Sequence, residues 1–179
     1  MKNIVGTGAF IGATRRASTL TRQRGFSLIE LLIVVAIILV LAAIAMPNLI
    51  RSKISANEAS AISSIRTINT AQVTYAVTYP LVGYADDLAK LAAPSGGGPA
   101  TSMNAGLIDW VLGCASQPCP KSGYSFRILN ANGTPVSSYT VVGTPQRLDI
   151  TGSRGFCSDS LNPVKYDPAG GIACTEDVR

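Results

Sequence analysis

Hydrophobic residues form one continuous run near the N-terminus of this chain. Residues 26–46 contain a single charged side chain, Glu30. At about 1.5 Å per residue, a helix over this run would be about 30 Å long, which matches the hydrocarbon core of a bilayer. The run therefore predicts a membrane-spanning helix over residues 26–46.

The pattern changes to a one-sided stripe over residues 47–78. Apolar or large residues recur there at spacings of three, four or seven, at Ile50, Ile54, Ala61, Ile65, Ile68, Gln72 and Tyr75. Charged and polar residues fall largely on the other faces, at Arg51, Glu58, Arg66 and Asn69. Pro47 removes one helical hydrogen bond and clashes with the carbonyl of Ala43, which predicts a kink. We expect one long helix kinked at Pro47, whose second half is amphipathic and is covered by a head formed by residues 79–179.

Short alternating segments in the head predict strands. Residues 124–129 alternate in period two, Asn132-Gly133 is a turn signal, and residues 139–142 continue the pattern after a link longer than a two-residue hairpin. Residues 148–157 and 164–166 are two weaker strand candidates. We predict an α+β fold with a small antiparallel sheet of about four strands, one face of which packs on the helix.

Charge is concentrated before the apolar run. Five of the 15 basic residues precede Phe26 with no acid among them, at Lys2, Arg15, Arg16, Arg22 and Arg24. The chain from Phe26 onward has ten basic and ten acidic residues, so bulk charge gives no support to nucleic-acid binding. Basic residues before the span favour a cytoplasmic N-terminus and an exported C-terminal part.

The four cysteines lie in the part of the chain that would be exported. An even number of cysteines in an oxidising compartment favours disulfides over a zinc site, and the chain has no histidine and no Cys-x-x-Cys pair. Three pairings are possible. Proximity in the sequence favours Cys114 with Cys119 and Cys157 with Cys174.

Residues for enzymatic chemistry are scarce. Without histidine the chain has no imidazole base, and it contains no phosphate-binding loop or serine nucleophile elbow. Asp86 and Asp87 lack a third ligand at useful spacing and are interpreted as a helix start. We predict no enzyme activity, no metal site and no cofactor.

Three residues at the start of the apolar run carry a resemblance. Gly25 follows the basic segment, Phe26 begins the run and Glu30 lies one helical turn later. This arrangement resembles the N-terminal signature of type IV pilins and of the related pseudopilins of type II secretion. A carboxylate inside a membrane helix is costly unless a partner compensates it, and the amino group of a chain that begins at Phe26 is a suitable partner.

The resemblance implies a processing and assembly pathway. Residues 1–25 would be a leader that a prepilin peptidase removes between Gly25 and Phe26, followed by methylation of the Phe26 amino group. The chain would be stored in the inner membrane and then join other copies, through an assembly platform, in a helical surface filament whose core is the 26–46 helix. The layout of the head is also similar to that of pilins.

Two alternatives stay open at this point. The chain resembles a type II secretion pseudopilin equally well over its N-terminus, and some pseudopilins suggest a calcium site at Asp159, Asn162 and Asp167, although ordinary turns explain these residues. The other alternative is an ordinary signal peptide with cleavage after residues 43–45, which would release a binding domain that begins at Met46.

Overall fold

The computed structural model describes residues 25–94, 96–161 and 163–178. The basic residues of the predicted leader lie outside this part of the chain. The chain divides into two compact units with a boundary between Leu41 and Ala42. The described part of the first unit is the beginning of one long helix, and the second unit contains the rest of that helix and the head.

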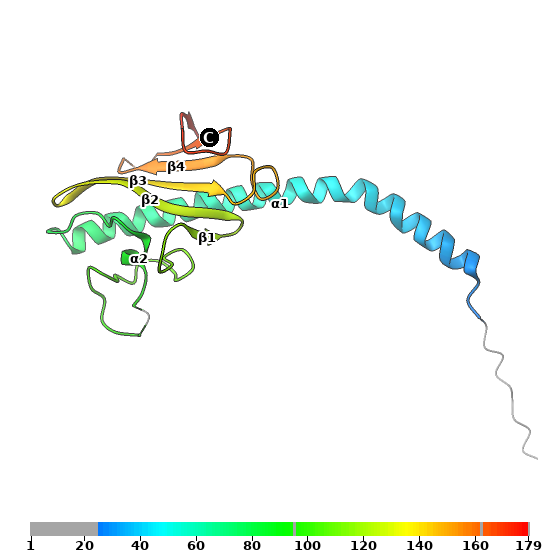
Figure 1. The fold of residues 1–179 in the computed structure, drawn as a ribbon, viewed down its shortest axis with the longest axis horizontal. Helices are drawn as coiled ribbons and strands as arrows, with labels where there is room; N and C mark the ends of the chain where they lie inside the picture. The colour runs from blue at the N-terminus through cyan, green and yellow to red at the C-terminus, as the bar shows by residue number, and fades with distance from the viewer. Residues whose placement is uncertain (1–24, 95, 162, 179) are drawn as a thin grey trace, which may run out of the picture. The chain divides into compact units, whose positions relative to one another are not determined.

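The long helix α1 extends over Leu28–Thr78, a length of 51 residues. Pro47 lies inside α1 and does not end it, because a proline removes only one backbone hydrogen bond from a helix. Within the second unit, α1 runs along the sheet of the head (Figure 1). The predicted α+β fold, with a long N-terminal helix packed on an antiparallel sheet, is confirmed.

The sheet is a meander in which every strand pairs with its neighbour in the chain. Its strands are β1 (Cys119–Lys121), β2 (Tyr124–Gly133), β3 (Val136–Pro145), β4 (Gly155–Asp159), β5 (Val164–Asp167) and β6 (Glu176–Asp177). All five pairings are antiparallel. The sheet has six strands rather than about four, because β1 and β6 are too short to show an alternating pattern.

Two details of the predicted strands were wrong. The link between β2 and β3 is only Thr134-Pro135, because register shifts after Leu129 let β2 continue to Gly133. Gly133 has a φ of 106°, in the region that favours glycine. Residues 148–152 form a hydrogen-bonded loop, in which the amides of Ile150 and Thr151 donate to the carbonyl of Arg147, and β4 begins only at Gly155.

The core lies between one face of α1 and one face of the sheet. The helix buries Ala61, Ile65, Ile68, Ala71 and Tyr75, and the sheet buries Tyr124, Phe126, Ile128, Tyr139, Val141 and Phe156. On β2 the buried residues alternate with more exposed ones, as in a strand with one covered face. Full burial of an isoleucine contributes about 1.5–3 kcal/mol, so Ile65 and Ile68 alone stabilise the contact substantially.

The segment between α1 and β1 is held by side chains of the helix. The Gln72 amide donates to the carbonyl of Ala85 and accepts from its N–H, both at 2.8 Å. The Tyr75 hydroxyl donates to the carbonyl of Ser102 at 2.5 Å. The short helix α2 (Leu88–Leu91) begins at Asp87, whose carboxylate accepts the N–H of Ala89. The pair Asp86-Asp87 thus includes a helix cap, as the sequence indicated.

Candidate functional site

The Gly25-Phe26 junction lies just before the first turn of α1. Phe26 is 80% exposed, and among the described residues no atom other than those of its chain neighbours lies within 4 Å of a Cβ placed on Gly25. Helix α1 begins two residues later, at Leu28. The peptide bond that the sequence assigns to a peptidase is therefore in accessible chain before the helix rather than inside it.

Glu30 has a partner that the sequence interpretation missed. Its Oε2 accepts the backbone N–H of Ser27 at 2.9 Å. Ser27 precedes the first helical residue, and a glutamate three positions later that binds its N–H is half of a capping box. The signal was visible as Ser-x-x-Glu before an apolar run. A carboxylate in the first turn also interacts favourably with the helix dipole.

The apolar segment that follows is exposed on every side. Each large apolar side chain from Leu28 to Met46 has between 46% and 80% of its surface exposed. Among the described residues, α1 is the helix that is long and apolar enough to cross a membrane. Burial of this surface requires lipid or other protein chains.

The amphipathic half of α1 differs from the predicted stripe at three positions. Ile50 was expected to face the head but is 53% exposed. Glu58 and Asn69 were placed on the outer faces, yet both are buried. The reason is that each finds polar partners in the head: Asn69 donates to the Ser158 hydroxyl at 2.7 Å and accepts from the Tyr139 hydroxyl at 3.1 Å.

Glu58 joins the helix to the chain just before β4. Its Oε1 accepts the Ser153 N–H, the Ser153 hydroxyl and the Arg154 N–H at 3.0, 2.9 and 3.2 Å. Its Oε2 accepts Nε and Nη2 of Arg154 at 3.0 and 2.6 Å. The Arg154 guanidinium also lies over the rings of Phe156 and Tyr166.

These contacts determine the ionisation of Glu58. Burial raises the pKa of this carboxyl, but the hydrogen bonds from Arg154 and Ser153 together with the Arg154 charge outweigh burial, so the pKa is lowered. The same ion pair raises the pKa of Arg154. The pair is therefore charged at neutral pH and fixes the head to α1.

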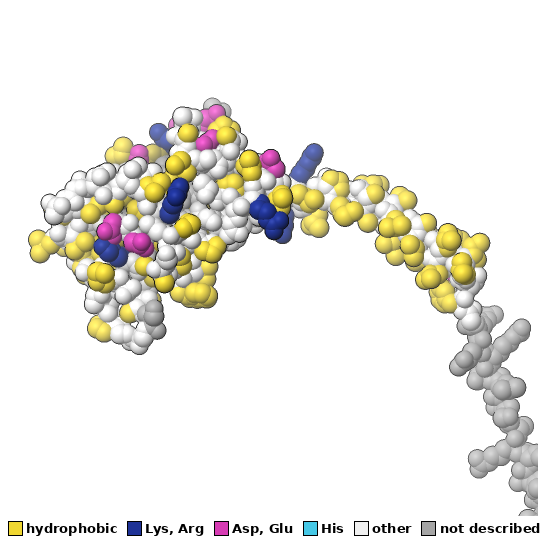
Figure 2. All heavy atoms as spheres, viewed as in Figure 1, with side chains coloured by type: hydrophobic (Ala, Val, Ile, Leu, Met, Phe, Trp, Pro, Cys, Tyr) yellow, Lys and Arg dark blue, Asp and Glu magenta, His cyan; other side chains and the backbone are white. Residues whose placement is uncertain are grey.

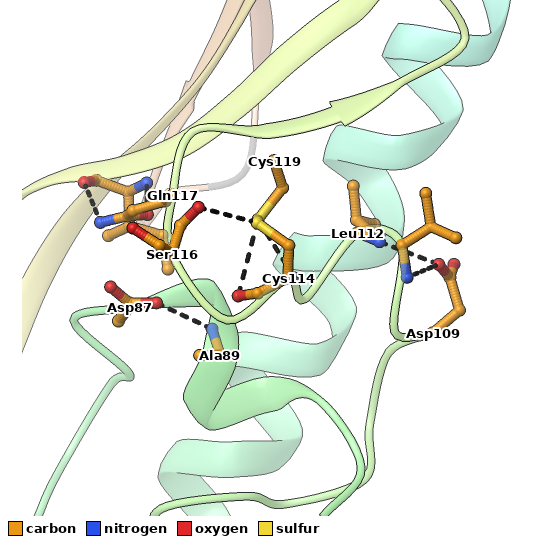
Figure 3. Close-up of a disulfide and its surroundings, with 10 residues drawn as sticks. Asp87, Ala89, Asp109, Leu112, Cys114, Ser116, Gln117 and Cys119 are labelled. Carbon is orange, nitrogen blue, oxygen red and sulfur yellow. Dashed lines mark hydrogen bonds between the residues drawn. A yellow bond between two sulfur atoms is a disulfide. The ribbon is translucent and has the colours of Figure 1, made fainter. Parts of the chain in front are cut away.

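Both cysteine pairs that proximity favoured are disulfides in the structure, Cys114–Cys119 and Cys157–Cys174. Figure 3 shows the first, with Gln117 inside its loop. The Gln117 side chain accepts the N–H of Ile128 at 2.8 Å and donates to its carbonyl at 3.4 Å, which fixes this loop to β2. The second disulfide connects β4 to the chain before β6.

The acidic residues near the C-terminus bind backbone amides. Asp159 accepts the N–H of Leu161, and Asp167 accepts the N–H groups of Ala169 and Ala173. Asn162, the third residue of the suggested calcium site, lies outside the described residues. Within the described part of the chain, no three His, Cys, Asp or Glu side chains are grouped so that they could hold a metal ion.

Comparison with known protein families matches the N-terminal region. Residues 20–46 match the family described as prokaryotic N-terminal methylation motif. A segment of the chain is similar in sequence to a type IV pilin. A protein named type IV major pilin protein PilA, from Myxococcus xanthus (strain DK1622), is 48% identical over 54 residues. That alignment covers 30% of this chain and 24% of the relative, and no solved structure matches.

The N-terminal segment and the head are thus described by different observations. The methylation motif concerns residues 20–46, and the similarity to the relative covers 54 residues, 30% of the chain. The head is described by its own hydrogen bonds, disulfides and core.

Proposed function

We propose that this chain is the precursor of a structural subunit of a type IV pilus. The observation that carries the proposal is the fully exposed apolar helix that begins directly after the Gly25-Phe26 junction and contains Glu30 in its first turn. The name of the Myxococcus relative supports a pilin over a secretion pseudopilin.

In the proposed pathway, residues 1–25 are a leader. A prepilin peptidase cuts between Gly25 and Phe26 at the cytoplasmic face and methylates the new amino group of Phe26. The accessibility of the junction supports this step, since the scissile bond need not be unwound from α1. Before assembly, residues 26–46 span the inner membrane with the head outside.

Assembly then transfers the apolar helix from lipid to a filament core. A carboxylate inside the membrane is unfavourable without a partner. The Ser27 N–H compensates only one of its oxygens, so Glu30 can also accept the charged Phe26 amino group of its own chain or of a neighbour at the assembly platform. Homopolymeric packing of the 26–46 helices would bury the exposed side chains, and the head would face the outside of an extracellular filament.

Two measurements test the proposal together. Intact mass and N-terminal sequencing of the protein from membranes and from sheared surface material would reveal its mature start. We expect a start at Phe26 with one added methyl group in both fractions.

Other outcomes separate the alternatives. A mature start at Met46 would indicate an ordinary signal peptide, although that cut would fall inside α1. A methylated start at Phe26 with no protein in the sheared fraction would instead assign the chain to a short periplasmic pseudopilus.

A further inference from the structure

One end of the head carries exposed cations and exposed apolar side chains next to α1. The chain from β3 to β4 leads to this end: Tyr139 contacts Asn69, Gly143 lies against Ile65, and the Thr151 carbonyl accepts the Asn57 amide at 2.8 Å. The chain therefore moves toward the N-terminal end of α1 as it leaves the sheet. Loop 146–151 therefore lies beside Asn57, in the part of α1 that follows Pro47.

Loop 146–151 is held in a fixed shape. The Thr151 hydroxyl bonds to both the N–H and the carbonyl of Arg147 at 3.0 Å, and the Asp149 N–H donates to the carbonyl of Gly152 at 2.9 Å. The side chains of Arg147, Leu148 and Ile150 are exposed. Leu148 and Ile150 are 52% and 53% exposed.

Two further cations lie on α1 between the apolar run and this loop. Arg51 and Lys53 are exposed, and neither they nor Arg147 form an ion pair among the described residues. The acid in the same loop is Asp149, while Glu58 is already paired with Arg154. Figure 2 shows Lys and Arg side chains gathered where α1 leaves the head.

We propose that this end of the head docks on the membrane surface before assembly, with Arg51, Lys53 and Arg147 at anionic lipid phosphates and Leu148 and Ile150 in the interface. The inference rests on the membrane stage of the proposed function. Cations that flank apolar side chains are the chemistry of an interfacial site on an anionic leaflet.

The distance along α1 is compatible with this contact. Arg51 is about 8 Å beyond Met46 along the helix, near the outer limit of the headgroup layer, and Asn57 is about 16 Å beyond it. Membrane helices tilt by about 20° on average, and the missing hydrogen bond at Pro47 loosens the turn between the span and Arg51. A tilt toward loop 146–151 brings its side chains to the headgroups.

A quenching experiment on the full-length chain tests the contact. All four cysteines are paired, so an introduced cysteine can be labelled selectively with a fluorophore. Gln146→Cys places the label in the loop and keeps its cations and apolar residues. The matched control is Leu161→Cys, at an exposed position after β4. Ser158 of β4 contacts Asn69, which lies about 18 Å farther along α1 than Asn57.

The protein would be reconstituted in phosphatidylethanolamine–phosphatidylglycerol vesicles with a nitroxide on a fraction of the headgroups. We expect strong quenching at position 146 and little at position 161. Arg147→Gln should lower the ratio of docked to undocked heads about fivefold, which corresponds to the binding free energy that one basic residue contributes at an anionic surface. Leu148→Ser with Ile150→Ser should also reduce quenching.

Three results would overturn the proposal: equal quenching at positions 146 and 161, unchanged quenching in phosphatidylcholine vesicles, or quenching that depends on protein density in the vesicle. The last would assign the loop to a contact with a second copy. The measurement needs no filament, so its failure is distinct from failure of pilus assembly, which surface shearing reports.

Discussion

The two halves of α1 differ in what can bury their apolar side chains. From Leu28 to Met46 the helix is apolar on all sides and has no cover within the described chain. From Glu58 to Tyr75 one face is buried in the head, and the polar residues Glu58 and Asn69 form hydrogen bonds with it. The first half therefore depends on lipid or other copies, whereas the second is stabilised within its own chain. Each half should respond to a different class of mutation.

The largest effect is expected for Glu30, which should affect assembly and leave the head intact. Glu30→Ala removes both the charge and the acceptor for the Ser27 N–H. We expect the amount of pilus protein in the sheared fraction to fall about tenfold or more, because the Phe26 amino group would then lie unpaired in an apolar environment. Urea unfolding of the head should be unchanged. Normal piliation of Glu30→Ala would contradict the hypothesis that Glu30 pairs with the Phe26 amino group.

Glu30→Gln separates the two roles of this residue. Glutamine can still accept the Ser27 N–H in a capping box but has no charge. We expect the same loss of assembly for Glu30→Gln as for Glu30→Ala. If Glu30→Gln assembles normally while Glu30→Ala does not, then capping is what matters and the charge is not required.

Next in size are the disulfides, which should affect the head alone. Cys157→Ser with Cys174→Ser opens a loop with a sequence separation of 17, and we expect the free energy of unfolding to fall by about 3 kcal/mol. Cys114→Ser with Cys119→Ser opens a separation of 5 and should cost about 2 kcal/mol. Urea unfolding of both variants checks the order, and the reverse order would contradict the loop-entropy account.

Glu58→Gln tests the contact between α1 and the head. It leaves Arg154 without its buried partner, but Arg154 is partly exposed and can regain water. We therefore expect a loss of about 2 kcal/mol in the free energy of unfolding. The control Asp177→Asn changes an exposed acid and should stay within about 0.5 kcal/mol of the natural chain. Equal effects of the two substitutions would mean that the ion pair does not hold the head.

The smallest effect is the pH dependence of the same contact. The pKa of Glu58 is lower in the folded chain than its ordinary value of 4.5. Its stabilisation is thus fully present above the unfolded pKa and is lost as pH falls through the lower folded pKa. We expect the natural chain to lose stability below about pH 4.5 more steeply than Glu58→Gln. Parallel pH profiles of urea midpoints would argue against this.

Much of the fold could be predicted because its signals are local. Twenty-one residues with one charge indicate a membrane-length helix in any context, and Tyr124, Phe126 and Ile128 alternate as a half-buried strand must. The short strands β1 and β6 could not be predicted. They have three and two residues, and only pairing with β2 and β5 makes them strands.

The candidate site divides in the same way. Gly25, Phe26 and Glu30 are neighbours in the chain, so their spacing and the resemblance that it carries were enough to predict a processing site, which stays a prediction. Ser27 could have been found by its spacing to Glu30. Glu58 was misplaced because its partners Ser153 and Arg154 are more than 90 residues away. From sequence alone, a polar residue is assigned to the surface when its hydrogen-bond partner is distant in the chain.

The sequence by itself determined the apolar helix and its charged first turn, and it favoured the two cysteine pairs, since these depend on residues that are near one another in the chain. Only the tertiary structure decided which face of α1 carries Glu58 and Asn69, where β4 begins, and that loop 146–151 lies beside Asn57. These features depend on contacts between distant segments, in which hydrogen bonds made on folding outweigh the preference of polar residues for water.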